Sequence, residues 1–118
     1  MIFDTTAVIQ AIRKKSDFEE GSISIITFIE VLRGIEDAEK REKTFSLLQQ
    51  AFKIDDVNPR VARAYLKLYF ELKRKEKSSP DADELIAATA LSQGEALLTS
   101  DKGFLKFEPF VKVKLVVG

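Results

Sequence analysis

The chain has 118 residues, and its 19 basic and 19 acidic side chains give a formal net charge of zero at pH 7. It contains no Cys and no His, which excludes disulfides, thiolate metal sites, histidine bases and Ser-His-Asp triads. The balanced charge provides no global field that would favour nucleic acid, so such a substrate would need a local basic patch. This length suits one hydrophobic core, and we expect residues 1–118 to form a single domain.

The N-terminal half alternates between strand and helix patterns. The short apolar run MIFDT, residues 1–5, predicts a strand, and residues 7–12 have helical spacing. The β-branched run SISIIT, residues 22–27, predicts a second strand. Helical segments follow over residues 28–35 and 36–51, and the second has four candidate core residues, Phe45, Leu47, Leu48 and Ala51.

A third strand, FKIDDV at residues 52–57, precedes the clearest amphipathic helix of the chain. This helix begins at Pro59, and its apolar residues recur at intervals of three and four: Val61, Ala64, Tyr65, Leu68, Tyr69 and Leu72. The polar connection KRKEKSSP, residues 73–80, leads to an apolar helix over residues 82–93. EALLTS, residues 95–100, then predicts a fourth strand.

The last predicted strand, VKVKLVV at residues 111–117, alternates at first between apolar and basic side chains, which places it at an edge of the sheet. Strands that alternate with helices indicate right-handed crossovers and a parallel sheet covered on both faces. The predicted fold class is therefore α/β, with three layers in the order α/β/α.

Four carboxylates fall where this topology would bring them together: Asp4, Glu30, Asp83 and Asp101. The carboxyl ends of parallel strands and the N-termini of the helices share one edge of the sheet, where such folds bind ligands. Two carboxylates about 5 Å apart repel each other by roughly 3 kcal/mol at an effective dielectric near 20. Such a cluster either raises the pKa values of its members or binds a cation, and oxygen ligands alone favour Mg²⁺ or Mn²⁺.

Each acid also has a local structural interpretation. TFIE, residues 27–30, and DADE, residues 81–84, both have the pattern of a capping box, with an N-cap residue followed by Glu at N3. Asp4 could cap the first helix, and Asp101 could lie in a turn. Capping leaves Asp83 with only a modest helix-dipole benefit of roughly 0.3–1 kcal/mol. Four acids at one edge therefore favour a functional cluster.

Three motifs resemble those of the PIN-domain ribonucleases, particularly the VapC-type toxins of prokaryotic toxin–antitoxin pairs. They are MIFDTTAVI at residues 1–9, SIITFIEVLRG at residues 24–34, and DELIAATALSQGEALLTSDKGF at residues 83–104. The resemblance implies a PIN-like fold with a parallel sheet of four to five strands in the order 3-2-1-4-5. It implies that Asp4, Glu30, Asp83 and Asp101 form a catalytic metal site. The hydroxyl of Thr99 would support this site, and either Thr5 or Thr6 would support Asp4.

The same resemblance implies an endoribonuclease that depends on Mg²⁺ (or Mn²⁺) and leaves 5′-phosphate and 3′-hydroxyl ends on single-stranded or structured RNA. Four basic residues are candidate RNA contacts: Arg33, Lys102, Arg13 and Lys14. The family further implies a homodimer and a cognate VapB-type antitoxin, for which Ile35, Phe45 and Leu48 could form a groove unless they belong to the core. We expect a cytoplasmic protein without a membrane partner.

Two alternatives share the same fold: a catalytically silent PIN-like module that binds RNA or protein, and a PIN nuclease with a housekeeping role. A receiver-like phosphoacceptor domain is a third, because Asp55 and Asp56 follow the third strand. Receivers need paired acids after the first strand, where this chain has only Asp4, followed by Thr5. The receiver alternative is therefore disfavoured.

Overall fold

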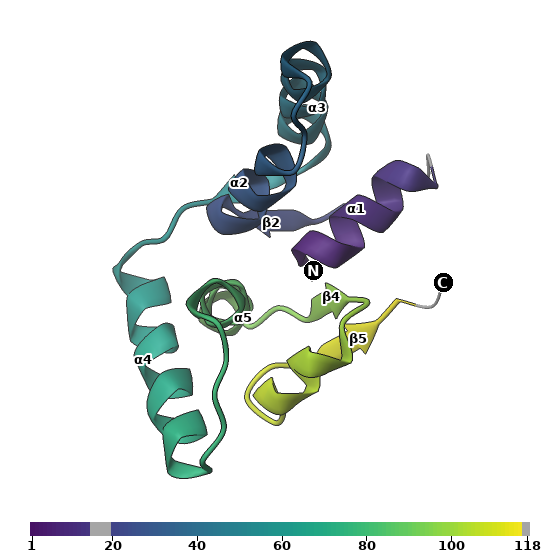
Figure 1. Ribbon diagram of the computed structural model, residues 1–118. Coiled ribbons are helices and arrows are strands. Elements are labelled where there is room, and N and C mark those ends of the chain that lie inside the picture. The colour runs from purple at the N-terminus through teal and green to yellow at the C-terminus, as the bar shows by residue number, and fades with distance from the viewer. Residues whose placement is uncertain (15–19, 117–118) are drawn as a thin grey trace.

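The computed structural model describes residues 1–14 and 20–116, which form one five-stranded sheet between two groups of helices (Figure 1). The strands lie in the order β3-β2-β1-β4-β5, and each pair of neighbours is parallel. The predicted fold class and strand order are both confirmed. The elements are β1 (Ile2–Phe3), α1 (Thr5–Arg13), β2 (Ser22–Ser24), α2 (Ile25–Arg33), α3 (Ala38–Ala51), β3 (Lys53–Asp55), α4 (Pro59–Arg74), α5 (Asp81–Gln93), β4 (Leu97–Thr99), the 3₁₀ helix η1 (Lys102–Phe107) and β5 (Val113–Leu115).

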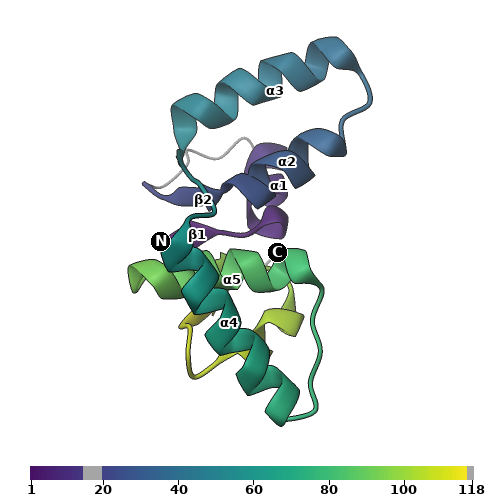
Figure 2. The ribbon, with the colours of Figure 1, turned by 90° about the vertical axis from the view of Figure 1, so that its left-hand side faces the viewer.

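Adjacent residues of the central strand point to opposite faces and divide the core in two. Ile2 packs with buried residues of α4, α5 and η1, whereas Phe3 packs with those of α1, α2 and α3. Figure 2 shows α2 and α3 above β1 and α4 and α5 below it. The period of two in a strand explains this division, because successive side chains alternate between the two faces. Apolar residues are therefore buried on both sides of the sheet.

The second strand is shorter than predicted because a serine side chain starts the next helix. Oγ of Ser24 accepts a hydrogen bond from the backbone N–H of Ile26 at 3.0 Å, and α2 begins at Ile25. The capping box predicted over residues 27–30 is therefore wrong. Thr27 lies inside α2 and is fully buried, so Glu30 does not act as the N3 residue of a cap.

The second predicted capping box is also wrong. Pro80 occupies the N-cap position of α5 and provides no side-chain hydrogen bond. Oδ1 of Asp81 instead accepts a hydrogen bond of 2.9 Å from the hydroxyl of Tyr65, which links the start of α5 to α4. Glu84 is only 3% exposed, so it does not fold back over the helix end in solvent. Both glutamates that the sequence assigned to helix caps therefore need another explanation.

Helices α3 and α4 bury fewer residues than their sequences predict. Leu48 is fully buried and Phe45 packs edge-on against Phe28, but Leu47 is 42% exposed. Tyr69 of α4 is also partly exposed, at 38%. A helix that covers one face of a sheet buries only the stripe that faces the sheet, and Leu47 lies about 100° around the helix axis from Leu48.

None of the helices in the described part of the chain combines the length and apolar character that a membrane span requires.

Candidate active site

Asp4 lies directly after the central strand and is the most buried of the four acids, at 1% exposure. Its Oδ1 accepts hydrogen bonds from the backbone N–H of Ala7 at 2.8 Å and from the hydroxyl of Thr6 at 2.7 Å. Its Oδ2 accepts a hydrogen bond from the hydroxyl of Thr99 at 2.5 Å. Asp4 is therefore the N-cap of α1, and its carboxylate is held by donors from both α1 and β4. The capping role and the role in the acidic cluster are compatible.

Two threonines connect the loops that follow β1 and β4. The hydroxyl oxygen of Thr6 accepts a hydrogen bond from the backbone N–H of Ser100 at 2.9 Å. The hydroxyl oxygen of Thr99 accepts one from the backbone N–H of Asp101, also at 2.9 Å. Because each hydroxyl also donates to Asp4, the segment that carries Asp101 is fixed relative to that carboxylate.

Asp101 follows β4 and is exposed. Its Oδ1 accepts a hydrogen bond of 2.8 Å from the backbone N–H of Gly103, so it caps η1 as the turn interpretation predicted. It also lies at the edge shared with Asp4, because β4 is the direct neighbour of β1.

Glu30 is held by the other threonine of the first motif. The hydroxyl of Thr5 donates a hydrogen bond of 2.7 Å to Oε1 of Glu30, and a guanidinium nitrogen of Arg33 lies 4.0 Å from Oε2. Thr5 and Thr6 therefore serve different carboxylates, Glu30 and Asp4. The sequence left open which of the two would support Asp4, since adjacent residues at a helix start differ in direction by about 100°.

Asp83, the third residue of α5, lies within electrostatic reach of the other three acids. Burial raises its pKa above the usual range, and the carboxylates of Glu30, Asp101 and Asp4 raise it further. The ammonium group of Lys106 opposes this effect. Acids that lie far apart in the sequence are thus close enough to repel one another in the fold.

The pKa of Asp4 is also raised, chiefly because burial removes the carboxylate from water. The hydrogen bonds from Thr99, Ala7 and Thr6 stabilise the charged form and oppose the shift, while the charge of Asp101 adds to it. Two carboxyl groups at this edge are therefore held in surroundings that disfavour their ionisation.

The chemistry of these side chains fits a hard divalent cation, because all the available ligands are oxygens and their negative charges are mutually repulsive. As the side chains lie, no three acidic residues within residues 1–14 and 20–116 form a group that could hold one metal ion. The side chains at this edge therefore have the charge and the oxygen donors that a divalent metal site needs, but they are not arranged as its ligands in this structure.

The four predicted RNA-binding residues do not lie together. Arg33 is beside Glu30, and Lys102 follows Asp101 in η1. Arg13 and Lys14 are at the opposite end of α1 from Asp4, and eight residues of helix correspond to roughly 12 Å. Arg13 lines a cavity of about 260 Å³ between α1, α2 and α3, together with Glu30 and Ile35.

Sequence reasoning missed Lys106, whose charge acts on both Asp83 and Glu84. Its Nζ donates a hydrogen bond of 3.1 Å to the backbone carbonyl of Ser78 in the connection between α4 and α5. Lys106 lies four residues after Lys102 in η1, but only the path of this 3₁₀ helix directs it toward α5.

The fold is that of a PIN domain. The PIN domain family model matches residues 1–108, and the chain belongs to this family. A curated relative, Ribonuclease VapC1 of Methanocaldococcus jannaschii, is 32% identical over 104 residues, which cover 86% of this chain and 76% of the relative.

Solved structures of other proteins share the fold, and two of them are VapBC proteins bound to DNA. VapBC2 from Rickettsia felis, bound to a DNA fragment from its promoter, includes a chain with a TM-score of 0.85 and 22% identity, covering 99% of this chain and 100% of that one. DNA-bound VapBC from Salmonella typhimurium includes one with a TM-score of 0.80 and 22% identity, covering 96% and 95%.

Proposed function

We propose that this protein is a metal-dependent ribonuclease that hydrolyses phosphodiester bonds of RNA, and that it is the toxin of a VapBC-type toxin–antitoxin pair. The observation that carries the proposal is the placement of Asp4 and Asp101 after the adjacent parallel strands β1 and β4, at the edge where Asp83 lies in the first turn of α5. The charges of Glu30, Asp101 and Asp4 all raise the pKa of Asp83, in agreement with this placement. The name of the 32% identical relative, a ribonuclease, supports the same activity.

In this proposal Asp4, Asp83 and Asp101 hold Mg²⁺ or Mn²⁺, and Glu30 is a further ligand or binds through water. When bound, such an ion supplies a water of lowered pKa and neutralises charge on the reacting phosphate. The chain has no His, so no imidazole competes for the role of base.

The chain itself provides orientation. The three donors to Asp4 hold its carboxylate in one direction, and two of these donors are hydroxyls that also accept backbone hydrogen bonds. Thr5 similarly orients Glu30. Partners of this kind orient metal ligands and typically change affinity or activity by roughly 10–100-fold when removed. Thr99 and Thr6 are thus positioning residues for Asp4, and Thr5 is one for Glu30.

RNA is held by cations close to the acidic edge. Arg33 and Lys102 are the proposed phosphate contacts, since each is adjacent to one of the acids and is exposed. Arg13 and Lys14 would contact only a longer RNA that extends along α1. Phosphate contacts make binding depend on salt.

The cavity between α1, α2 and α3 is the proposed site of a VapB-type antitoxin. Apolar side chains of Ile9, Ile12, Val31 and Ile35 line it, with Glu30 among them. A segment bound there would therefore reach the acidic edge. Structures that share this fold are of VapBC complexes, which supports the choice of partner, and a homodimer is proposed on the family resemblance.

The test is cleavage of end-labelled single-stranded RNA by purified protein in Mg²⁺ or Mn²⁺, with and without EDTA. We expect cleavage that EDTA abolishes, and fragments with 5′-phosphate and 3′-hydroxyl ends. A protein that binds RNA but never cleaves it would instead be a silent PIN-like module. Co-expression with the product of a neighbouring small gene distinguishes a toxin, whose growth arrest is relieved, from a housekeeping nuclease.

A further inference from the structure

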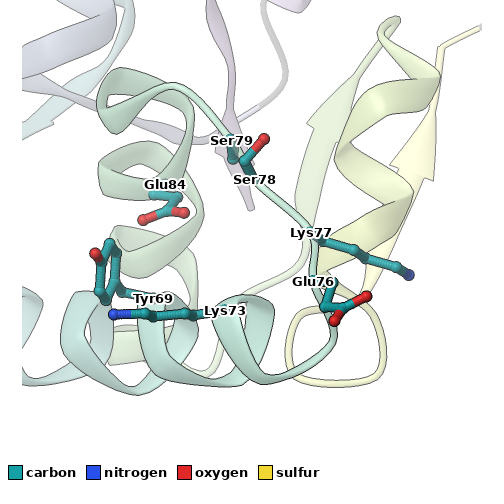
Figure 3. A pocket seen from close by; sticks show the side chains of 7 residues that line it. All are labelled: Tyr69, Lys73, Glu76, Lys77, Ser78, Ser79 and Glu84. Atoms are coloured by element: carbon teal, nitrogen blue, oxygen red, sulfur yellow. The ribbon is translucent and has the colours of Figure 1, made fainter.

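A second cavity, of about 340 Å³, lies where α4 ends and α5 begins (Figure 3). The connection between these helices passes over it, and its walls include Tyr69, Lys73, Lys77, Ser79 and Glu84. In Figure 3, Glu84 lies close to Tyr69 and Lys73, whereas Lys77 and Glu76 extend away from it. The volume is within the range of roughly 300–1,000 Å³ that small-molecule sites occupy.

Two buried polar atoms at this cavity have no hydrogen-bond partner among the described residues: Oε2 of Glu84 and Oγ of Ser79. Glu84 is only 3% exposed, and it lines the cavity. An unsatisfied buried polar group costs about 1–3 kcal/mol, and more for a charged group. Such groups in a folded protein need an explanation, and a ligand that donates hydrogen bonds to them provides one.

The charges around the cavity restrict what that ligand can be. Lys73 and Lys77 line it, and Lys106 is bonded to the carbonyl of Ser78 at its edge. A cationic guest would meet these ammonium groups, and an anionic guest would meet the buried carboxylate of Glu84. A guest with neutral donors on one side and a phosphate on the other satisfies both.

Tyr69 adds an aromatic ring that is 38% exposed. It stacks on Tyr65 at a centroid distance of 6.0 Å, and Nζ of Lys73 lies 6.0 Å from its centroid. A flat guest can stack on this ring when the Lys73 side chain turns toward the guest's phosphate.

We propose that this cavity binds a guanine base of the RNA substrate, with Glu84 accepting hydrogen bonds from its Watson–Crick edge, Tyr69 stacking on it and Lys73 contacting its phosphate. The proposal rests on the ribonuclease function proposed above and adds a specificity site to it. Unstacked bases of single-stranded RNA are bound in this way, on aromatic side chains and through their base edges.

Guanine is favoured because of its donors. Its N1–H and its exocyclic amine lie side by side and match the two oxygens of one carboxylate. Adenine and cytosine present one amine beside a ring nitrogen that accepts, and uracil presents one N–H between two carbonyls. Each of these places an acceptor against a carboxylate oxygen, which is repulsive. The hydroxyl of Ser79 can donate to the guanine carbonyl or accept from a donor.

The cavity adjoins the acidic edge. Glu84 follows Asp83 on α5, so the two carboxylates leave the helix about 100° apart, one toward the other acids and one toward α4. Lys106 lies close enough to influence both. A nucleotide held at Glu84 would thus place a neighbouring phosphodiester near Asp83.

Direct binding tests the site without any cleavage. The full-length protein in EDTA is titrated with GMP, AMP, CMP and UMP while its backbone amide NMR signals are followed. We expect GMP to bind about tenfold or more tightly than the others and to shift signals of residues 73–84. Glu84→Gln should remove this preference, and Glu76→Gln, which changes a glutamate of the same cavity that points away, should not. Thermal melts confirm that each variant is folded.

A second pair of variants tests the site independently if Glu84→Gln does not fold. Tyr69→Ala should weaken GMP binding about tenfold because the stacking ring is lost, and Tyr69→Phe should retain GMP binding. Equal binding of all four nucleotides, no binding at all, or binding of an arginine-containing peptide instead would each overturn the proposal.

Cleavage then separates this inference from the proposed function. RNA oligonucleotides that differ at one position, guanosine or inosine, are compared; inosine lacks the exocyclic amine. We expect the wild type to favour guanosine and Glu84→Gln to lose that preference. Cleavage by the wild type without any preference would reject the cavity but keep the nuclease. GMP binding without cleavage of any RNA would keep the guanine site and reject the nuclease function.

Discussion

The hydroxyl of Thr99 donates a hydrogen bond of 2.5 Å to Oδ2 of Asp4, a residue 95 positions away in the chain. This bond joins the carboxyl ends of two adjacent parallel strands at the point where the chain leaves the sheet in opposite directions. It ties Asp4, at the start of α1, to the end of β4.

Thr99→Val removes this hydroxyl while keeping the shape of the side chain. Asp4 then loses one donor and the N–H of Asp101 loses its acceptor. We expect activity to fall roughly 10–100-fold, because such groups orient metal ligands, and the free energy of unfolding to fall by about 1–3 kcal/mol. Thr99→Ser should restore both quantities. Cleavage rates and urea unfolding measure them, and full activity in Thr99→Val would exclude the positioning role.

Asp4→Asn should abolish cleavage yet stabilise the metal-free fold. The folded-state pKa of Asp4 is raised above its unfolded value of about 3.8, so its ionised form is disfavoured in the folded protein. The stability that the neutral carboxyl provides is present below the unfolded pKa and is lost as the pH rises through the folded pKa. In EDTA at pH 7 the variant should therefore melt at a higher temperature than the wild type. This difference should vanish near pH 3, and a lower melting temperature at pH 7 would contradict the burial effect.

Divalent metal should stabilise the wild type by binding only the folded state. At a concentration 100 times its Kd, an ion raises the free energy of unfolding by about 2.7 kcal/mol. We expect Mn²⁺ or Mg²⁺ to raise the melting temperature of the wild type, EDTA to reverse the effect, and Asp83→Asn to remove it. Glu39→Gln, an exposed acid on α3, is the matched control and should respond as the wild type does. An equal metal response in Asp83→Asn would remove this residue from the ligand set.

Arg33→Gln should weaken RNA binding more at low salt than at high salt. One phosphate contact on a single strand contributes roughly 0.7 to the slope of log K against log salt, so this slope should decrease by about that amount. Lys43→Gln changes another exposed cation, on α3, and should leave the slope unaltered. Fluorescence anisotropy of labelled RNA at several salt concentrations provides the slopes. Identical slopes for the wild type and Arg33→Gln would show that Arg33 contacts no phosphate.

The hydroxyl of Tyr65 should ionise late. Its hydrogen bond to Asp81 raises its pKa to about 12, since removing the proton would place two negative charges together. The stability contributed by the neutral phenol is full below the ordinary pKa near 10 and is lost as the pH rises toward 12. In Tyr69→Phe, where Tyr65 is the single tyrosine, absorbance of the phenolate should report a midpoint near 12. Adding Asp81→Asn should lower that midpoint, and far-UV circular dichroism identifies any unfolding.

Glu30 and Glu84, the two glutamates of the predicted capping boxes, show where the local sequence pattern does not predict the helix N-terminus. Both fit the spacing of a helix N-terminus, but Ser24 starts α2 three residues before the expected cap, and Tyr65 holds Asp81 from another helix. Glu30 instead accepts a hydrogen bond from the hydroxyl of Thr5, and Glu84 is buried beside a cavity. The competing partners come from segments that a local pattern does not include.

Much about this protein follows from its sequence alone. The alternation of strands and helices, the absence of Cys and His and the positions of four acids predict a parallel sheet with a carboxylate edge, because strand polarity is a consequence of crossover connections. The tertiary structure decided which threonine serves which acid and that the charge of Lys106 acts on Asp83. It also decided that Oε2 of Glu84 is buried without a hydrogen-bond partner among the described residues. These depend on rotations of about 100° per residue and on where helices end, and both are set by packing against distant segments of the chain.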